Sequence, residues 1–359
     1  MTGFLRNAAM ACAVGVVTLT GAGYAQAEFP ERPITMIVAY SAGGGTDVAA
    51  RSLAPFIETY LGGSITVVNK PGAGGEVGFT EISQAEPDGY TIGFLNTPNL
   101  VTIPIERDTR YELENFSPIA NVVDDPGGFH VRQESEFQTL EALIAYAKEN
   151  PNAVTYGTTG IGSDDHLAAL ALQRQAGIEM THVPFPGASA VRAALLGGHI
   201  TLGVFNMGEA VSYAEEGLIR PLGQMAEERW SEMPEVPTFR EQGYDIVQGS
   251  TRGIGAPAGV PEEILQQVAA AIEKAINDPE FQKVAAEQSL PLRFLAPDAY
   301  KAMLTTARDS YVTLWEEVPG LRDRGRDPHR HRLRSEALPM PPCVTGLRRL
   351  DRCGVQRSR

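Results

Sequence analysis

The chain has 359 residues and a formal net charge of −14 at pH 7, and this charge is unevenly distributed. Residues 319–359 carry eleven Arg, no Lys and four acidic residues, a net of +7, which leaves −21 for residues 1–318. Such an acidic body argues against nucleic acid and anionic membrane surfaces as partners. The three cysteines are Cys12, Cys343 and Cys353, so residues 28–318 offer no disulfide, thiol nucleophile or cysteine-bound metal.

The first 27 residues are predicted to be an export signal that is cleaved after Ala27. Arg6 is their only charge, an apolar run extends from Ala8 to Leu19, and residues 25–27 have the small-x-small form of a cleavage site. The run is shorter than the roughly 18 apolar residues that indicate a membrane span. We therefore expect a soluble periplasmic protein; the alternative is a buried helix over residues 8–23.

Short β-branched runs alternate with helical stretches after the signal, which predicts an α/β fold with largely parallel sheets. In the first unit the predicted strands are residues 34–40, 65–68 and 90–95. A helix with an apolar stripe begins near Asp47 and ends at Gly62. Pro55 is expected to bend this helix or to lie in its first turn.

A second α/β unit is predicted to start near Pro126. Its expected strands are residues 154–156, 181–185, 200–205 and 219–223, with helices over 164–175 and after Gly187 and Gly208. Residues 246–255 are extended again, and helices over 261–277, 280–287 and 300–317 close the body. The mature chain of about 290 residues can bury enough core for two lobes without disulfides.

Residues 319–359 differ in character from everything before them. They are rich in Arg, lack apolar periodicity and contain Pro339, Pro341 and Pro342. This composition predicts a basic, disordered tail. We interpret it as an atypical or out-of-frame C-terminus; the alternative is a basic arm that binds acidic partners.

Three loops of small residues each follow a predicted strand and precede a helix. They are Ser41–Asp47, Lys70–Gly75 and Gly157–Ser163, and His166 follows the third loop. Ligands of open α/β sheets bind at such carboxyl ends of strands. Glycines let the backbone approach a ligand, and free amides at a helix start attract negative charge over short distances. The loops predict a carboxylate site; the alternative is that they only form tight turns.

The glycine loops do not match known catalytic motifs. None of them continues as a Walker loop, and Gly72-x-Gly74 is followed by Val77 where a dinucleotide fingerprint needs Gly or Ala. The run Gly187–Val191 lacks the final glycine of a nucleophile elbow. We therefore predict no catalytic residue and no cofactor.

The histidines do not indicate a metal centre either. The spacings of His166, His182 and His199 match no helix-based pair of zinc ligands. Ser163, Asp165 and His166 would lie on one helical turn, where their side chains do not align as a catalytic triad. We expect no metal, and a structural role for His182 and His199.

The sequence resembles the receptor subunits of tripartite tricarboxylate transporters, which are also called Bug proteins. The resemblance covers about residues 29–318, and its motifs occur in the order expected of that family. They are Phe29–Ile34, Gly43–Asp47, Asn69–Gly75, Pro87–Thr91, Tyr156–His166, Thr181–Phe185, Leu196–His199, Pro234–Thr238 and Ala256–Pro261.

This resemblance implies a two-lobed periplasmic-binding-protein fold of the Venus-flytrap type II, with a discontinuous first lobe. Lobe 1 would comprise residues 28–125 and 250–318, and lobe 2 residues 126–249. The chain would cross the hinge near Val123 and Gln248.

The resemblance also implies a carboxylate site that is built mostly from backbone amides, with Ser and Thr groups of the second lobe completing it. The implied ligand-binding residues are Ser41, Ala42, Gly43, Gly44, Thr46, Asp47, Gly72, Ala73, Gly74, Thr158, Thr159, Gly160, His166, Asn206 and Arg252. Three positions depart from the family pattern, namely Ser41-Ala42, Pro186 and Arg252. Arg252 would clamp a second carboxylate or pair with a surface acid. His166 would either donate to the ligand or cap and pack its own helix.

By resemblance, the chain is expected to be a periplasmic solute-binding receptor that captures a small organic carboxylate. It would deliver this ligand to the membrane subunits of a tripartite transporter and act as a monomer. Two alternatives stay open: a ligand sensor that feeds a two-component signalling system, and an exported α/β enzyme.

Overall fold

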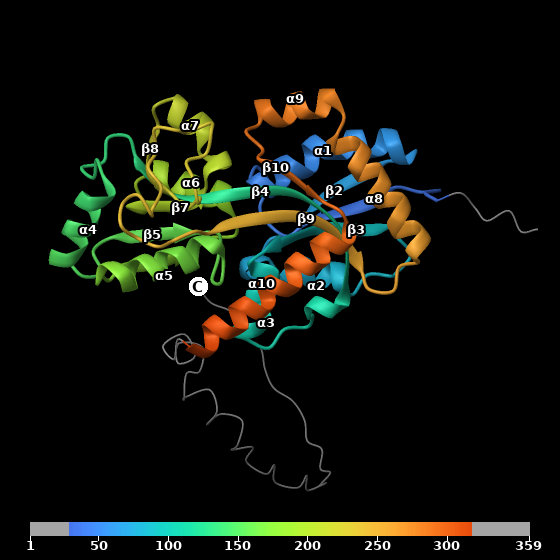
Figure 1. The fold of residues 1–359 in the computed structure, drawn as a ribbon, viewed down its shortest axis with the longest axis horizontal. Coiled ribbons are helices and arrows are strands. Elements are labelled where there is room, and N and C mark those ends of the chain that lie inside the picture. The colour runs from blue at the N-terminus through green and yellow to red at the C-terminus, as the bar shows by residue number, and fades with distance from the viewer. Residues whose placement is uncertain (1–28, 318–359) are drawn as a thin grey trace, which may run out of the picture.

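The computed structural model describes residues 29–317 (Figure 1). The predicted export signal and the predicted basic tail therefore lie outside the described residues. Within residues 29–317, no helix is both long enough and apolar enough to cross a membrane.

One continuous mixed sheet runs through both lobes. Its strand order is β2-β1-β3-β9-β4-β7-β5-β6, and β10 and β8 also pair with β4. The bounds are β1 Ile34–Val38, β2 Ile65–Asn69, β3 Thr91–Thr97, β4 Phe116–Arg132, β5 Thr155–Thr158, β6 Thr181–Pro184, β7 Leu202–Asn206, β8 Ile219–Gln224, β9 Gly249–Pro257 and β10 Leu292–Leu295.

Among the named strands of residues 29–317, parallel pairing occurs at the two ends of the sheet. Strand β1 is parallel to β2 and β3, and β5 is parallel to β6 and β7. The strands between them, β4 and β9, are antiparallel to each other and to their other partners. Both pass from one lobe to the other (Figure 1). The expected parallel units are therefore joined by two long antiparallel strands.

The helices cover the faces of this sheet. Their bounds are α1 Gly45–Leu61, α2 Glu76–Ser83, α3 Asn99–Glu106, α4 Leu140–Glu149, α5 Asp164–Ala176, α6 Ala188–Leu196, α7 Val211–Glu215, α8 Glu262–Ile276, α9 Pro279–Glu287 and α10 Pro297–Glu317, with a 3-10 turn η1 at Ala73–Gly75 and another, η3, at Met207–Glu209. In Figure 1, α4 to α7 surround one lobe, and α1, α8 and α9 lie on the other.

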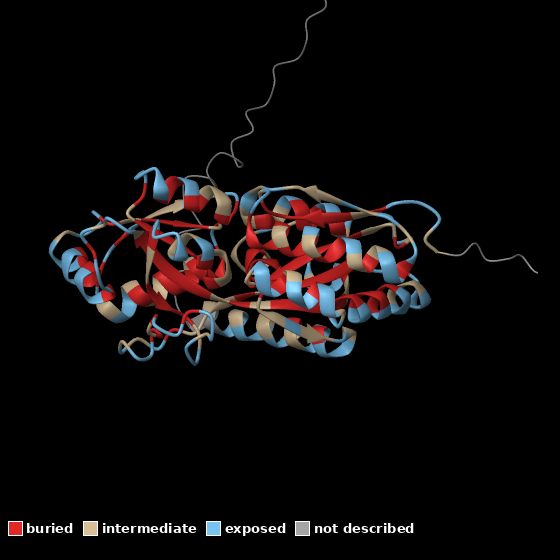
Figure 2. Cartoon of the chain, turned by 90° about the horizontal axis from the view of Figure 1, so that it is seen from above, coloured by how far each residue is buried: buried red, intermediate tan, exposed pale blue. Residues whose placement is uncertain are grey.

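Each lobe has its own hydrophobic core. In lobe 1 the core includes Ile34, Leu53 and Ile272, and in lobe 2 it includes Phe129 and Leu172. Figure 2 shows buried strands inside both lobes, with exposed residues on the outward faces of the helices. Burial of this kind stabilises each lobe in proportion to the apolar area that it removes from water.

Helix α1 shows how the local sequence produces an element that positions the site. Leu53, Ile57 and Leu61 recur at helical spacing and are fully or almost fully buried. The helix ends at Gly62, whose φ of 79° places it in the left-handed region that favours glycine. Pro55 lies inside the helix rather than in its first turn.

Candidate functional site

The loop between β1 and α1 brings backbone amides to the interlobe cleft. Gly44 precedes the helix in an extended conformation, and the amide of Gly43 donates to Asp47 Oδ2 at 2.9 Å. The other Asp47 oxygen accepts from Arg51 Nε at 2.9 Å, so this charge is compensated. Asp47 stabilises the loop, while the start of α1 retains its preference for an anion.

The loops of the two lobes touch through glycines. Gly74 belongs to the 3-10 turn η1, and its carbonyl accepts from Asn99 Nδ2 at 2.9 Å. A Cβ atom on Gly160, whose φ is 135°, would lie 2.7 Å from Gly74 Cα. No larger residue fits this backbone contact, which explains the glycine at position 160.

Further hydrogen bonds hold the lobes together. Ser41 Oγ lies 2.9 Å from Ser189 Oγ, and Thr102 Oγ1 donates to the Gly162 carbonyl at 2.7 Å. Arg192 Nη2 donates to the Gly43 carbonyl at 2.7 Å. The structure is therefore a closed arrangement of the two lobes.

The loop after β5 is stabilised mainly by its own contacts. Thr158 Oγ1 lies 2.7 Å from His182 Nε2, and Thr159 Oγ1 donates to Asp165 Oδ2 at 2.8 Å. Ser163 caps α5 by accepting from the amide of His166 at 3.2 Å.

His166 has the geometry of a residue that caps and packs its own helix. Its Nδ1 accepts from the amide of Gly162 at 3.2 Å, and its ring stacks on that of His182 with centroids 4.3 Å apart. These contacts correspond to the second of the two roles considered for this residue.

Arg252 lies at the centre of a buried polar cluster where the lobes meet. Its Nη1 donates to Asp125 Oδ2 at 2.8 Å, and its Nη2 donates to Asn206 Oδ1 at 3.0 Å. The same Nη2 lies 3.9 Å from Glu209 Oε1, which accepts a hydrogen bond from the amide of Gly45. The side chains of Arg252 and Asp125 are 3% and 1% exposed, so the partner of this arginine is a buried acid.

Burial in this cluster raises the pKa values of its acids Asp125 and Asp164. Burial raises the pKa of Asp125 to about 7, although the charge of Arg252 opposes the shift. Burial likewise raises the pKa of Asp164 to about 6 against a hydrogen bond from Asn206. Burial acts to lower the pKa of Arg252, but Asp125 and Glu209 outweigh it and the pKa is raised. Arg252 therefore remains charged.

A cavity of about 20 Å³ lies against this cluster. Five of the predicted site residues line it, namely Gly44, Thr46, Thr159, Asn206 and Arg252, together with Tyr40, Gly45, Asn96, Asp164, Ala188, Glu209 and Ser250. A neighbouring hollow of about 190 Å³ shares Gly45, Glu209 and Arg252 with it and is also lined by Gly43. Neither cavity is lined by the remaining predicted residues, which are Ser41, Ala42, Asp47, Gly72, Ala73, Gly74, Thr158, Gly160 and His166.

Sequence reasoning missed three acids of the cluster, Asp125, Asp164 and Glu209. Glu209 had a usable signal, because it follows strand β7 by three residues and the carboxyl ends of strands were already of interest. Asp125 had none, because the residues around it do not have the pattern of a strand.

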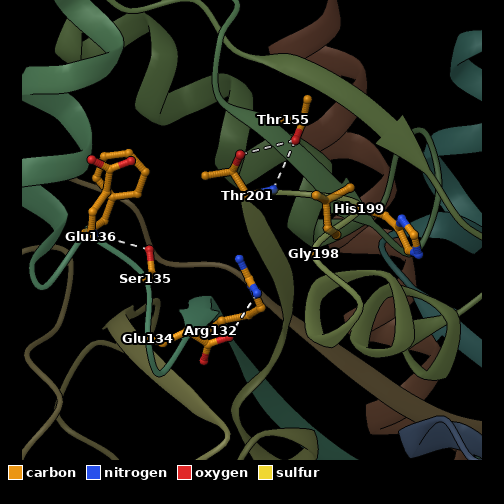
Figure 3. A pocket seen from close by; sticks show the side chains of 10 residues that line it. Arg132, Glu134, Ser135, Glu136, Thr155, Gly198, His199 and Thr201 are labelled. Carbon is orange, nitrogen blue, oxygen red and sulfur yellow. Dashed lines mark hydrogen bonds and ion pairs between the residues drawn. The ribbon is translucent and has the colours of Figure 1, made fainter.

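A hollow of about 260 Å³ lies on lobe 2 (Figure 3). Its walls include Arg132, Glu134 and His199, and Arg132 Nη1 is paired with Glu134 Oε1 at 2.9 Å. It contains none of the predicted ligand residues, and all of its lining belongs to one lobe. Among residues 29–317, no group of three or more His, Cys, Asp or Glu is arranged to hold a metal ion.

The two-lobed α/β architecture is that of the class of periplasmic solute-binding proteins. Within it, residues 49–305 match the model of the tripartite tricarboxylate transporter family receptor, and the chain belongs to this family. The chain is 33% identical over 300 residues to a protein encoded in the gbd 5′ region of Cupriavidus necator, covering 83% of this chain and 91% of that one.

Two solved structures show the same fold. The periplasmic binding protein BugD superimposes with a TM-score of 0.76 at 28% identity, covering 80% of this chain and 98% of that one. MatC from Rhodopseudomonas palustris, with bound malate, has a TM-score of 0.74 at 25% identity and covers 83% of this chain and 100% of that one.

Proposed function

We propose that this receptor captures a small organic carboxylate between its lobes and delivers it to the membrane subunits of a tripartite transporter. The observation that carries the proposal is the amide at the start of α1, which lies beside the buried guanidinium of Arg252 in the interlobe cleft. Backbone amides at a helix start and an arginine are both suited to a carboxylate.

Export and lobe boundaries belong to the same proposal. The chain is cleaved after Ala27 and works in the periplasm as a monomer. Lobe 1 comprises residues 28–125 and 250–318, and lobe 2 residues 126–249, which agrees with the separate membership of the two cores. The pairs Asp125–Ser250 and Pro126–Gly249 of β4 and β9 lie at this boundary.

The proposed ligand site consists of the small cavity and the loops around it. The α1 amides and Arg252 bind the carboxylate, and Thr159 and Asn206 contact the rest of the ligand. The loops at Gly72–Gly74 and Thr158–Gly160 meet when the lobes close and exclude water from the ligand. The related MatC was solved with bound malate, which is a small organic carboxylate.

Mass spectrometry of solute that remains bound through purification, followed by thermal shift with a panel of carboxylates, tests this function. A ligand that binds the folded state raises the melting temperature as its concentration increases. The variant Gly44→Val should lose this rise, because its side chain would enter the loop beside Ala188 and Glu209. Exposed Ala286→Val is the matched control. Normal carboxylate binding by Gly44→Val would place the site elsewhere.

A further inference from the structure

Glu209 of lobe 2 reaches across the cleft to the start of α1 in lobe 1. It ends the 3-10 turn η3, and its Oε1 accepts from the amide of Gly45. A Cβ atom on Gly45 would lie 2.6 Å from this oxygen and 2.9 Å from the Arg252 guanidinium carbon. Gly45 therefore leaves room for one carboxylate, and a side chain of the protein already occupies that room.

The space beside Glu209 is too small for a solute. The cavity of about 20 Å³ is close to the room that one water molecule needs, roughly 10–15 Å³. An organic carboxylate can enter only if the lobes open or Glu209 leaves.

Glu209 is incompletely satisfied where it lies. Its Oε2 is buried and has no hydrogen-bond partner among residues 29–317, and Arg252 is shared with Asp125 at the shorter distance of 2.8 Å. A buried carboxylate with one unpaired oxygen carries a desolvation cost that favours its exchange for a better-bonded anion.

The adjacent hollow of about 190 Å³, which Glu209 and Arg192 both line, has room for this carboxylate. Arg192 donates to Gly43 and lies over the ring of Tyr213 at 5.1 Å, but it forms no ion pair within residues 29–317. Its Nε and Nη1 are buried without hydrogen-bond partners in the same part of the chain. A buried cation of this kind is stabilised by an arriving carboxylate.

We propose that the carboxylate of Glu209 occupies the position, beside the Gly45 amide and Arg252, that the carboxylate of a bound ligand takes. It holds the empty receptor closed through Gly45 and Arg252, and an entering ligand carboxylate displaces it toward Arg192. This proposal rests on the proposed function. It makes Glu209 a residue that sets affinity, because every ligand must replace it.

The test measures binding of malate and adipate by calorimetry and, without ligand, hydrogen exchange at the amide of Gly45. Glu209→Gln keeps the shape and removes the charge, so it should bind the better of the two probes about tenfold more tightly. Glu209→Ala also removes the acceptor oxygen and should exchange the Gly45 amide faster. Exposed Glu215→Gln makes the same change in net charge on the same lobe and should match the wild type. Thermal unfolding establishes that each variant is folded.

The Arg192 step has its own readout. Arg192→Met should weaken ligand binding more in the wild-type background than in the Glu209→Gln background, because only the wild type has a carboxylate at position 209 that moves toward Arg192. Equal weakening in both backgrounds overturns this step. Binding by the wild type with no gain in Glu209→Gln overturns the displacement alone. If no variant binds any member of the carboxylate panel, the proposed function fails together with this proposal. Unchanged Gly45 exchange in Glu209→Ala removes the resting contact whatever binds.

Discussion

Replacing Arg252 by methionine tests the electrostatics of the cleft. Arg252→Met leaves Asp125 and Glu209 buried without their shared cation. At 2.8 Å and an effective dielectric constant of about 20, the attraction between Arg252 and Asp125 is about 6 kcal/mol. Desolvation offsets most of this in the intact pair, but removal of one partner of a buried pair costs about 3–5 kcal/mol. We expect this loss in the free energy of unfolding at pH 9, well above the Asp125 pKa of about 7, and a smaller loss near pH 7, where the carboxylate can take up a proton instead.

Urea unfolding followed by far-ultraviolet circular dichroism measures the loss, and two controls separate its causes. Asp125→Asn combined with Arg252→Met removes both charges and should cost clearly less than the sum of the single variants. The deficit of Arg252→Met should also shrink at pH 5. Asp125, whose pKa is already raised to about 7 in the wild type, is then protonated and needs no cation.

A loss below about 1 kcal/mol in Arg252→Met at pH 9, or strict additivity in the double variant at that pH, would refute this reasoning. Either result would mean that water or a rearranged side chain compensates Asp125 as well as Arg252 does.

Three further outcomes follow from the same structure. The folded-state pKa of Asp125 lies above its unfolded value of 3.8, so the contribution of this group to stability falls as pH rises from about 4 to 7. In a series of urea midpoints over this range, Asp125→Asn should therefore gain stability relative to the wild type as pH rises. In Gly160→Ala the new Cβ would lie 2.7 Å from Gly74 Cα and keep the lobes from closing fully. This variant should bind the carboxylate at least about tenfold more weakly and have a larger radius of gyration in X-ray scattering at saturating ligand. An unchanged affinity would contradict the closed contact. Ser163→Ala removes the cap of α5 and should cost about 1 kcal/mol, whereas Ser310→Ala on the exposed surface of α10 should cost little.

The sequence predicted the repeating units well because their signals are local. Strand β1 and helix α5 were expected at 34–40 and 164–175 and are found at Ile34–Val38 and Asp164–Ala176. β-branched runs and capping residues determine such elements within a few residues of chain. The family and the two-lobed fold are confirmed by the comparisons.

The long strand β4 could not be predicted in the same way. It contains Pro118, Pro126 and two consecutive glycines, which are turn signals in a local reading. It is nevertheless a strand because β9, β7 and β8 supply hydrogen-bond partners from distant parts of the chain. Register shifts at Pro118/Ala120 and Asn121/Val123 accommodate the residues that do not suit a regular ladder.

Only part of the cluster around Arg252 could be predicted from the sequence, for the same reason. Arg252 and Asn206 were candidates by resemblance, but the choice between a ligand contact and an internal partner depends on Asp125, which lies 127 positions away in the chain. No local pattern reports such a pairing, and it emerges only from the register of β4 on β9.

Two uninterrupted strands, β4 and β9, connect the lobes side by side, with Asp125 opposite Ser250 and Pro126 opposite Gly249. When the receptor opens, the lobes must therefore twist this two-stranded ribbon, because within residues 29–317 no flexible linker is available about which they could rotate freely. Asp125 belongs both to this pair of strands and to the polar cluster, so one residue links the charge inside the cleft to the strands that connect the lobes. Mutations there will alter how quickly the receptor opens as well as how firmly it holds its cargo.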